Sequence, residues 1–345
     1  RSCSLHRSLQ HPGTLLAGPR YFSQEISAAA EAFGREQRSG TRFLVTRSVR
    51  KLLRRLDPVL WAESKVKTAM PAAESLGNLL EEFEDAADGV IGKGGGSETP
   101  RGLFKNLEKI VSDAARLEQM LPHDPVPVDL VRAVAAWAYV ASAGGPQIVI
   151  IEEAHTLQEG ARNAMLKILE EPPSNTRFIL TTSRRSAIIP TIRSRLRSYE
   201  VPERTGEDQE AVQKRIFRME AVYPSLREFF RTRRGGDGDS WPEICRDLLG
   251  QLEAGSSTHQ IELRLKAMLA ETSPRHGAEY FLDALEEEIL RRLRRKDGGP
   301  LSAPVLHSWG AILRRYWARI DGRNMNPPAV LSGLILALRR TMEAK

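Results

Sequence analysis

The sequence predicts an α/β core in the N-terminal part of the chain and an all-α part after it. Up to Pro202, short apolar runs alternate with helical segments, a pattern typical of a parallel sheet with crossover helices. After Glu203 no further strand is predicted, and apolar residues recur at helical spacing in residues 278–295 and 329–341. A chain of 345 residues has room for two or three domains.

Four short apolar runs are expected to be the strands of the core: residues 14–17, 43–46, 148–151 and 178–181. The region 48–121 is helical in propensity but is broken by glycines. Three glycine-rich stretches, residues 88–102, 235–240 and 296–304, are expected to be linkers or exposed loops.

The composition is that of a globular protein that works inside the cell. Hydrophobic residues make up 41% and charged residues 28%, and the net charge of +7 favours a polyanionic partner without proving one. The two cysteines, Cys3 and Cys245, exclude a disulfide framework and a zinc site built from thiols, so we expect a reducing, cytoplasmic setting. The first twenty residues lack the apolar core of a secretion signal.

An uncharged stretch, residues 133–151, has the length of a membrane span but is expected to be something else. Gly144, Gly145 and Pro146 interrupt it where lipid would demand an unbroken helix. We therefore predict a helix, a turn and a buried strand.

Polar side chains follow two of the predicted strands directly. Glu152 and Glu153 come after residues 148–151, and Thr181 and Thr182 end the next strand. The carboxyl ends of parallel strands meet at one sheet edge, where ligands bind, so these groups could hold Mg²⁺, a phosphate or an attacking water. The alternatives are a solvated pair of acids and ordinary β-propensity of threonine.

Two helices are predicted beside these strands. Thr156 and Glu159 have the spacing of a capping box, and Pro172 and Pro173 would stop the helix that follows. Its buried stripe is expected to consist of Ala161, Ala164, Met165, Ile168 and Leu169. Further on, Pro190 opens a short helix whose arginines, Arg193, Arg195 and Arg197, cannot all be buried, so at least one faces solvent or a partner.

This segment resembles the bacterial clamp-loader subunits of the AAA+ type. Residues 148–196, IVIIEEAHTLQEGARNAMLKILEEPPSNTRFILTTSRRSAIIPTIRSRL, are similar to the family's Walker B strand, its N-A-L-L-K-x-L-E-E-P-P helix, its sensor 1 and its T-I-x-S-R-C arginine-finger motif. Met165 replaces a usual Leu and Leu196 the usual Cys, while the finger position is occupied by Arg195 after Ser194. Within the family, the resemblance is greatest to the delta-prime subunit of DNA polymerase III.

The resemblance continues more weakly toward both ends. Residues 11–33 are similar to the family's first strand, phosphate loop and helix, and residues 321–340 to the last helix of its collar. The resemblance implies an AAA+ P-loop-like core over residues 1–203, a small helical lid over 204–248 and a helical collar for oligomerisation over 249–345. The family's four zinc-binding cysteines are absent, so no zinc module is expected.

The phosphate loop departs from the pattern G-x-x-x-x-G-K-[ST] that holds a triphosphate. Gly18 and Pro19 are retained, but Ser23 replaces the second glycine, Gln24 the lysine and Glu25 the hydroxyl that ligates Mg²⁺. Losing a lysine and gaining a carboxylate removes most of the affinity for phosphate. Neither Glu152, one methylene longer than the usual Asp, nor Glu153 restores it, so we predict that no nucleotide is bound productively.

The resemblance then implies a non-hydrolytic subunit that acts through its neighbours. Arg195, with Ser194 beside it, would reach in trans toward ATP and Mg²⁺ held by an adjacent motor subunit of the gamma/tau kind. The other partners implied are a delta subunit, the sliding clamp and primed DNA. The chain would be a component of a DNA-directed DNA polymerase holoenzyme, a nucleotidyltransferase complex, without ATPase or polymerase activity of its own.

Several alternatives stay open. The chain could be an active AAA+ motor subunit with an unusual loop, or a DNA-binding module that works outside replication. Arg195 could be an ordinary surface arginine or the partner of an internal ion pair. The basic runs 51–55 and 291–296 could bind DNA or be solvated helix faces. The seven histidines show no metal-ligand spacing, and no metal is expected.

Overall fold

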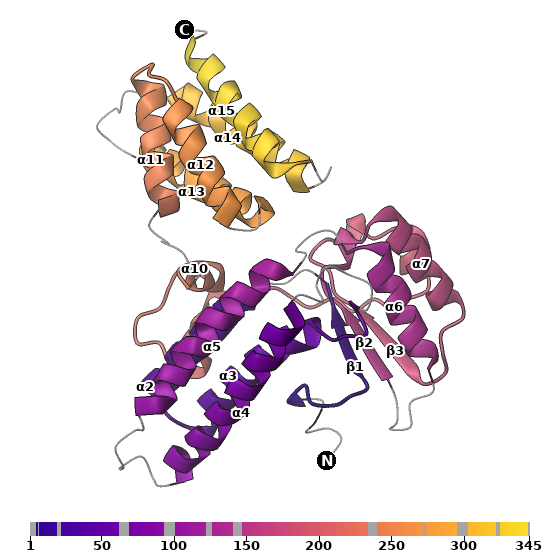
Figure 1. The fold of residues 1–345 in the computed structure, drawn as a ribbon. Coiled ribbons are helices and arrows are strands. Elements are labelled where there is room, and N and C mark those ends of the chain that lie inside the picture. The colour runs from indigo at the N-terminus through magenta and orange to yellow at the C-terminus, as the bar shows by residue number, and fades with distance from the viewer. Residues whose placement is uncertain are drawn as a thin grey trace. The chain divides into compact units, whose positions relative to one another are not determined.

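The computed structural model describes residues 5, 7–18, 22–61, 69–92, 101–121, 126–140, 147–233, 240–271, 274–294, 303–321 and 325–343. The chain divides into two compact units, Arg1–Gly236 and Asp237–Lys345 (Figure 1). The expected fold class is confirmed, because the first unit contains a parallel sheet with helices and the described residues of the second are helical.

A parallel sheet lies at the centre of the first unit. Its strands are β1 (Thr14–Ala17), β2 (Gln147–Ile151) and β3 (Thr176–Leu180), in the order β1-β2-β3. Leu15 pairs with Val149, and Val149 in turn with Phe178. Three of the four predicted strands are thereby confirmed, and all three carboxyl ends lie at the same edge.

The fourth predicted strand, residues 43–46, is helical instead. These residues lie within α3 (Ser39–Arg55), where Val45, Val49 and Leu52 are fully buried. Their spacing of four and three residues is that of one helix face, and this longer periodicity overrides the short apolar run.

Helices cover the sheet and build one continuous apolar core (Figure 1). On one side α6 (Val128–Tyr139) and α7 (Glu159–Glu170) pack against each other, followed by the short α8 (Pro190–Arg193). On the β1 side lie α2 (Ser23–Arg35), α3, α4 (Met70–Gly92) and α5 (Arg101–Met120). The region 48–121 is thus helical where it is described, and α4 includes the start of the glycine-rich stretch 88–102; residues 93–100 lie outside the described residues.

The stretch 133–151 contains a helix and a strand, as predicted. It includes the end of α6 and all of β2, while residues 141–146 between them lie outside the description. No helix among the described residues is long and apolar enough to cross a membrane.

The second unit consists of helices around their own core. They are α11 (Ser240–Glu253), α12 (His259–Glu271), α13 (Pro274–Leu293), α14 (Ala303–Asp321) and α15 (Pro327–Glu343). Trp309, Phe281 and Leu334 are fully buried there. Cys245 is packed in the same core, and burial raises the pKa of its thiol well above the ordinary value. The border between lid and collar that the resemblance implies, at residue 248, falls inside α11.

A small helical module, residues 205–233, packs on α2. It contains α9 (Gly206–Ala211), the π-helical turn η4 (Val212–Ile216) and α10 (Leu226–Arg231). Thr205 caps α9, since its hydroxyl accepts the amide of Asp208 while its own amide donates to that carboxylate. Phe217 and Phe229 of the module pack on Ala28 of α2.

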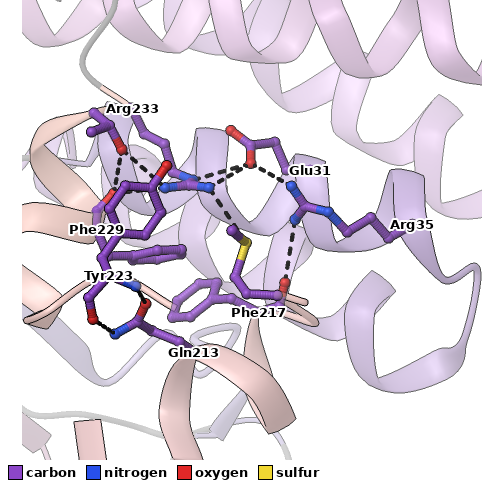
Figure 2. A network of polar contacts seen from close by, with 9 residues as sticks. Glu31, Arg35, Gln213, Phe217, Tyr223, Phe229 and Arg233 are labelled. Carbon is purple, nitrogen blue, oxygen red and sulfur yellow. Dashed lines mark hydrogen bonds and ion pairs between the residues drawn. The ribbon is translucent and has the colours of Figure 1, made fainter. Parts of the chain in front are cut away.

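A buried arginine joins this module to α2 (Figure 2). Arg233, whose side chain is 6% exposed, donates two hydrogen bonds to Glu31 of α2, at 2.8 and 3.1 Å. Its guanidinium also donates to the carbonyl of Phe229 at 2.7 Å and lies 3.9 Å from that ring's centroid. Glu31 accepts a further bond from Arg35 of α2, at 3.0 Å, and Arg35 donates to the carbonyl of Phe217. One carboxylate therefore satisfies two arginines at the contact between module and core.

Replacing Glu31 by Gln is expected to loosen the module. A neutral amide leaves the buried charge of Arg233 poorly compensated, which we expect to cost about 1 to 2 kcal/mol because Glu31 itself is partly exposed. Hydrogen exchange of the α10 amides would then be about fivefold to thirtyfold faster. The control is Glu210→Gln in α9, which removes an ion pair to Lys214 with both side chains about half exposed and should change little. Equal effects of the two variants would contradict the role given to Glu31.

Candidate functional site

Backbone hydrogen bonds tie the carboxyl ends of the three strands together. The amide of Glu152 donates to the carbonyl of Ala17, and the amide of Thr181 to that of Ile151, at 2.8 and 2.9 Å. A third bond joins the residues that follow β2 to those that follow β3, since the amide of Ala154 donates to the carbonyl of Thr181 at 2.8 Å. The structure thereby brings the strand-end residues named from the sequence to one edge.

Gly18 cannot carry a side chain at this edge. Its φ of +118° lies in a region that favours glycine, and an added Cβ would stand 2.2 Å from the carbonyl oxygen of Glu152. The turn after β1 is therefore pressed against the backbone of the acidic pair. Pro19, the next residue of the loop, lies outside the described residues.

Glu153 and Thr182 belong to a connected polar group. Glu153, in the left-handed conformation with φ of 48°, accepts a bond from Ser183 at 3.1 Å, and its carboxylate lies 3.4 Å from Nδ1 of His155. The same Nδ1 lies 3.0 Å from the hydroxyl of Thr182. Glu153 and Thr182 thus have partners within the chain, and His155, which sequence reasoning passed over, connects them.

The helix after the phosphate loop begins on a carboxylate from elsewhere in the chain. The first amides of an α-helix have no acceptor inside the helix and attract anions. Here the amides of Phe22 and Ser23 donate to Oε1 and Oε2 of Glu118 at 3.2 and 2.7 Å. Glu118 comes from α5 and is 5% exposed. Its two oxygens occupy the place where oxygens of a phosphate would accept these bonds.

The other two replaced positions of the loop also face inward. Gln24 is buried, and Glu25 accepts two bonds from the ammonium of Lys51 in α3, at 2.6 and 2.7 Å. The carboxylate at the usual hydroxyl position is therefore largely neutralised by a buried lysine. The repulsion of a triphosphate by Glu25 is therefore weaker than the sequence alone indicates, because sequence reasoning did not foresee Lys51.

Arg55 is a second buried cation near this edge. Burial lowers the pKa of its guanidinium to about 10, and the nearby carboxylate of Glu152 acts in the opposite direction. Its Cζ lies 5.3 Å from the centroid of the Trp61 ring, while its Nη1 has no hydrogen-bond partner. With this pKa the side chain remains a cation at neutral pH.

The predicted capping box at Thr156 is not formed. Thr156 ends the 3₁₀ turn η2 (Ala154–Thr156), and its hydroxyl donates to the carbonyl of Glu153. The helix α7 begins three residues later, after Gln158. A local bond to a preceding carbonyl competes with capping for threonine, which explains the difference. The buried stripe of α7 is as predicted, with Ala164 partly buried.

Arg195 follows α8 and is held by two acceptors. Its Nη1 donates to the carbonyl of Thr191 at 2.9 Å, and its Nη2 pairs with Glu170 at the end of α7, at 2.5 Å. Ser194 donates to the same carbonyl of Thr191, at 3.0 Å. The internal ion pair that sequence reasoning left open is thus formed, between side chains that are both substantially exposed.

The two basic runs are used largely inside the molecule. In residues 51–55, Lys51 pairs with Glu25, Arg54 donates to the carbonyls of Leu9 and His11, and Arg55 is buried. In the second run, Arg291 and Arg292 pair with Glu288, and Arg292 also with Glu253. Arg291 and Arg294 of the second run are exposed. Among the described residues, no group of three or more His, Cys, Asp or Glu is placed to hold a metal ion.

The fold and this edge define the class of protein: an α/β core with a parallel sheet, followed by a C-terminal unit whose described residues are helical. The family model described as DNA polymerase III, delta subunit, matches residues 108–205. Subunit gamma/tau of DNA polymerase III from Mycobacterium tuberculosis (strain ATCC 25618 / H37Rv) is 35% identical over 130 residues, which are 36% of this chain and 22% of that protein. Subunit delta' from Pseudomonas aeruginosa is 38% identical over 80 residues, 23% of this chain and 24% of the relative.

In these matches the chain is similar to subunits of bacterial DNA polymerase III, as the motifs indicated. Escherichia coli (strain K12) subunit delta' is 44% identical over 57 residues, 16% of this chain and 17% of that protein. A solved gamma subunit-related protein from Thermotoga maritima covers 68% of this chain and 90% of its own length at 15% identity, with a TM-score of 0.35. The chain aligns with less than a quarter of the length of the delta' and gamma/tau relatives named here.

Replacing Glu118 by Gln is expected to destabilise the first unit by about 1 kcal/mol, because the amides of Phe22 and Ser23 lose a charged acceptor. For a unit of this size the melting temperature should fall by about 2 to 4 °C. Glu108→Gln is the matched control, since Glu108 is exposed on the same helix. An identical melting temperature for both variants would contradict the importance of this contact.

Proposed function

We propose that this chain is a delta-prime-like subunit of a bacterial DNA polymerase III clamp loader that does not hydrolyse ATP. It would assemble in the cytoplasm with motor subunits of the gamma/tau kind and a delta subunit, and take part in placing the sliding clamp on primed DNA. The names of its relatives support the assembly, and the particular role rests on the site described above.

The observation that carries the non-hydrolytic part is the carboxylate of Glu118 on the first amides of α2. A triphosphate would have to displace this buried group from the amides it needs. The position of the phosphate-binding lysine holds Gln24, so no new charge attraction would drive the exchange. Neither binding of ATP nor a metal ion is part of the proposal for this chain; ATP and Mg²⁺ would be bound by the neighbour.

Arg195 is proposed as the arginine finger that acts in trans, with Ser194 beside it. It lies on the short turn after α8, outside the core, and its acceptors are a backbone carbonyl and the half-exposed Glu170. Exposed ion pairs contribute about 0 to 1 kcal/mol, so exchanging Glu170 for a phosphoryl group of a neighbour costs little. The planar guanidinium can then donate two parallel bonds to phosphate oxygens.

The contact between the small helical module and α2 supports a rigid subunit. The buried Arg233 and the aromatic cluster around Phe229 attach the module to the helix whose N-terminus Glu118 occupies. Both sides of this contact come from the chain itself. A rigid subunit of this kind would hold Arg195 in one position while the neighbouring subunits change conformation.

The alternative is an active motor subunit. It is favoured by the gamma/tau relatives, which align over 130 residues of this chain, compared with 80 for the Pseudomonas delta' subunit. The two functions differ in whether the isolated chain binds ATP.

The proposal predicts that the isolated chain has no Mg²⁺-dependent affinity for ATP stronger than about 1 mM, or about −4 kcal/mol. The reason is the missing lysine together with the internal carboxylate of Glu118. Isothermal titration with and without Mg²⁺ measures this directly. A micromolar, Mg²⁺-dependent dissociation constant would replace the proposal with the motor alternative.

The finger is tested in a reconstituted clamp loader. Arg195→Ala should lower DNA-stimulated ATP turnover by about a thousandfold or more while the complex still assembles. Arg195→Lys should also be defective, since lysine keeps the charge but lacks the planar fork. Arg132→Ala removes an exposed arginine of α6 and should leave turnover unchanged. Wild-type turnover in an intact complex with Arg195→Ala would refute the finger.

A further inference from the structure

A groove lies between α6 and α7, which pack side by side in the first unit (Figure 1). The chain enters the two helices in the same direction, because Val126 and Leu157 form a parallel bridge and the amide of Gln158 donates to the carbonyl of Val126 at 3.2 Å. The groove has a volume of about 510 Å³. This volume lies within the range of about 300 to 1,000 Å³ that is typical of binding sites.

The floor of the groove is apolar and is formed by one face of each helix. Its residues recur at spacings of four or seven along the helices: Val128, Ala135 and Tyr139 in α6, and Gly160, Ala164 and Ile168 in α7. Such spacings keep each set on one face. Half of these residues are glycine or alanine, whose side chains are too small to fill the space between two helices, so a groove remains.

Contacts within the chain define both ends of the groove. At the end where the helices begin, Gly160 lies against Val128, and a Cβ added to the glycine would stand 3.5 Å from the valine side chain. At the other end the hydroxyl of Tyr139 donates to the carbonyl of Glu171, the residue that follows α7, at 2.8 Å. The packing of the helix pair therefore sets the shape of the groove.

Exposed apolar side chains continue the floor at the end of α6. Tyr139 is 59% exposed, and Val140, the next residue, is 65% exposed. Tyrosine is enriched at protein interfaces, and an apolar patch beside a groove is typical of a surface that packs on another molecule. The groove and these two side chains therefore suit the apolar face of a helix, which could lie along α6 and α7.

The charge of the groove favours an acidic partner. Two cations, Arg132 and Lys167, line it, together with Asn163 and no acid. Arg132 is paired with Asp129, whereas Lys167 is exposed and forms no ion pair with a described residue. A carboxylate beside the apolar face of a partner would complement Lys167. A phosphate backbone would share the attraction to Lys167 but would leave the apolar floor in water.

We propose that the groove between α6 and α7 binds an acidic amphipathic helix of a partner protein. Apolar side chains at i, i+4 and i+7 of that helix lie on the floor, and a carboxylate beside them pairs with Lys167. From Gly160 to Ile168 the floor is about 12 Å long, so a helix of two to three turns covers it. The proposal goes beyond the function proposed above, because it depends neither on Arg195 nor on the absence of a nucleotide.

The test uses the full chain and a fluorescein-labelled synthetic peptide of about 14 residues, made of Leu, Ala and Glu, with Leu at i, i+4 and i+7 and Glu on both sides of this stripe. Fluorescence anisotropy should give a dissociation constant of about 100 μM or tighter. A scrambled peptide of the same composition, and a peptide with Lys in place of Glu, should each bind at least about tenfold more weakly.

Two positions test the charge and the floor separately. Lys167→Glu should weaken binding about tenfold or more, while Lys167→Arg should keep it, since either cation can pair with a carboxylate. Ala164→Leu fills the groove and should also weaken binding about tenfold or more, with its melting temperature measured to show that the chain is folded. The matched controls, Lys109→Glu in α5 and Ala136→Leu in α6, change exposed residues outside the groove and should stay within about twofold of the wild type.

The proposal is overturned if the scrambled peptide binds as well as the designed one, or if neither groove variant weakens binding. An unlabelled oligonucleotide of equal charge that displaces the peptide as well as unlabelled peptide does would make the groove a nucleic acid surface instead. Self-association of the wild type that is lost in Ala164→Leu, measured by sedimentation, would make a second copy of the chain the occupant. None of these measurements involves ATP turnover, so this proposal and that for Arg195 can fail separately.

Discussion

The bond between Glu118 and the first amides of α2 is the constraint on which the functional edge depends. A helix that starts at a sheet edge needs an acceptor there, and ligand-binding proteins leave that place to the ligand. In this chain α5 supplies the acceptor. The same contact fixes α5 against α2. Together with the close approach of Gly18 to Glu152, it makes this edge of the sheet a packed one.

The strands of the core could be predicted because each is a short apolar run, and two of them lead directly into polar residues. The run at residues 43–46 has the same appearance, but its side chains belong to a helical face that continues to Val49 and Leu52. A run of four apolar residues does not distinguish the period of a strand from that of a helix. The longer pattern, which continues to Leu52, is helical. Thr156 illustrates a similar limit. Its hydroxyl could accept from the amide of Glu159 in a capping box or donate to the carbonyl of Glu153, and the motif indicated the first whereas the structure has the second.

The candidate site could be located from the sequence, but its partners could not. The motif showed that Gln24 and Glu25 replace the groups that bind a triphosphate. It did not show that Lys51 neutralises Glu25, that Glu118 lies on the helix start or that Glu170 holds Arg195. These pairs join residues 26, 95 and 25 positions apart. No periodicity or local motif encodes such contacts, which depend on how the helices pack. His155 was missed for the same reason.

The arginines show why net charge locates function poorly until the partners are known. Arg233 and Arg55 are buried, one satisfied by Glu31 and the other lying over Trp61, and they act within the core. In the runs that are most basic in the sequence, several cations also have partners inside the chain: Glu25, Glu288 and backbone carbonyls. The segment after β3 is different. There Arg195 has an exposed ion-pair partner, and Arg193 and Arg197 are exposed without an ion pair to a described residue. A charge that the fold does not use is available to another molecule, and in the proposed function that molecule is a neighbouring subunit.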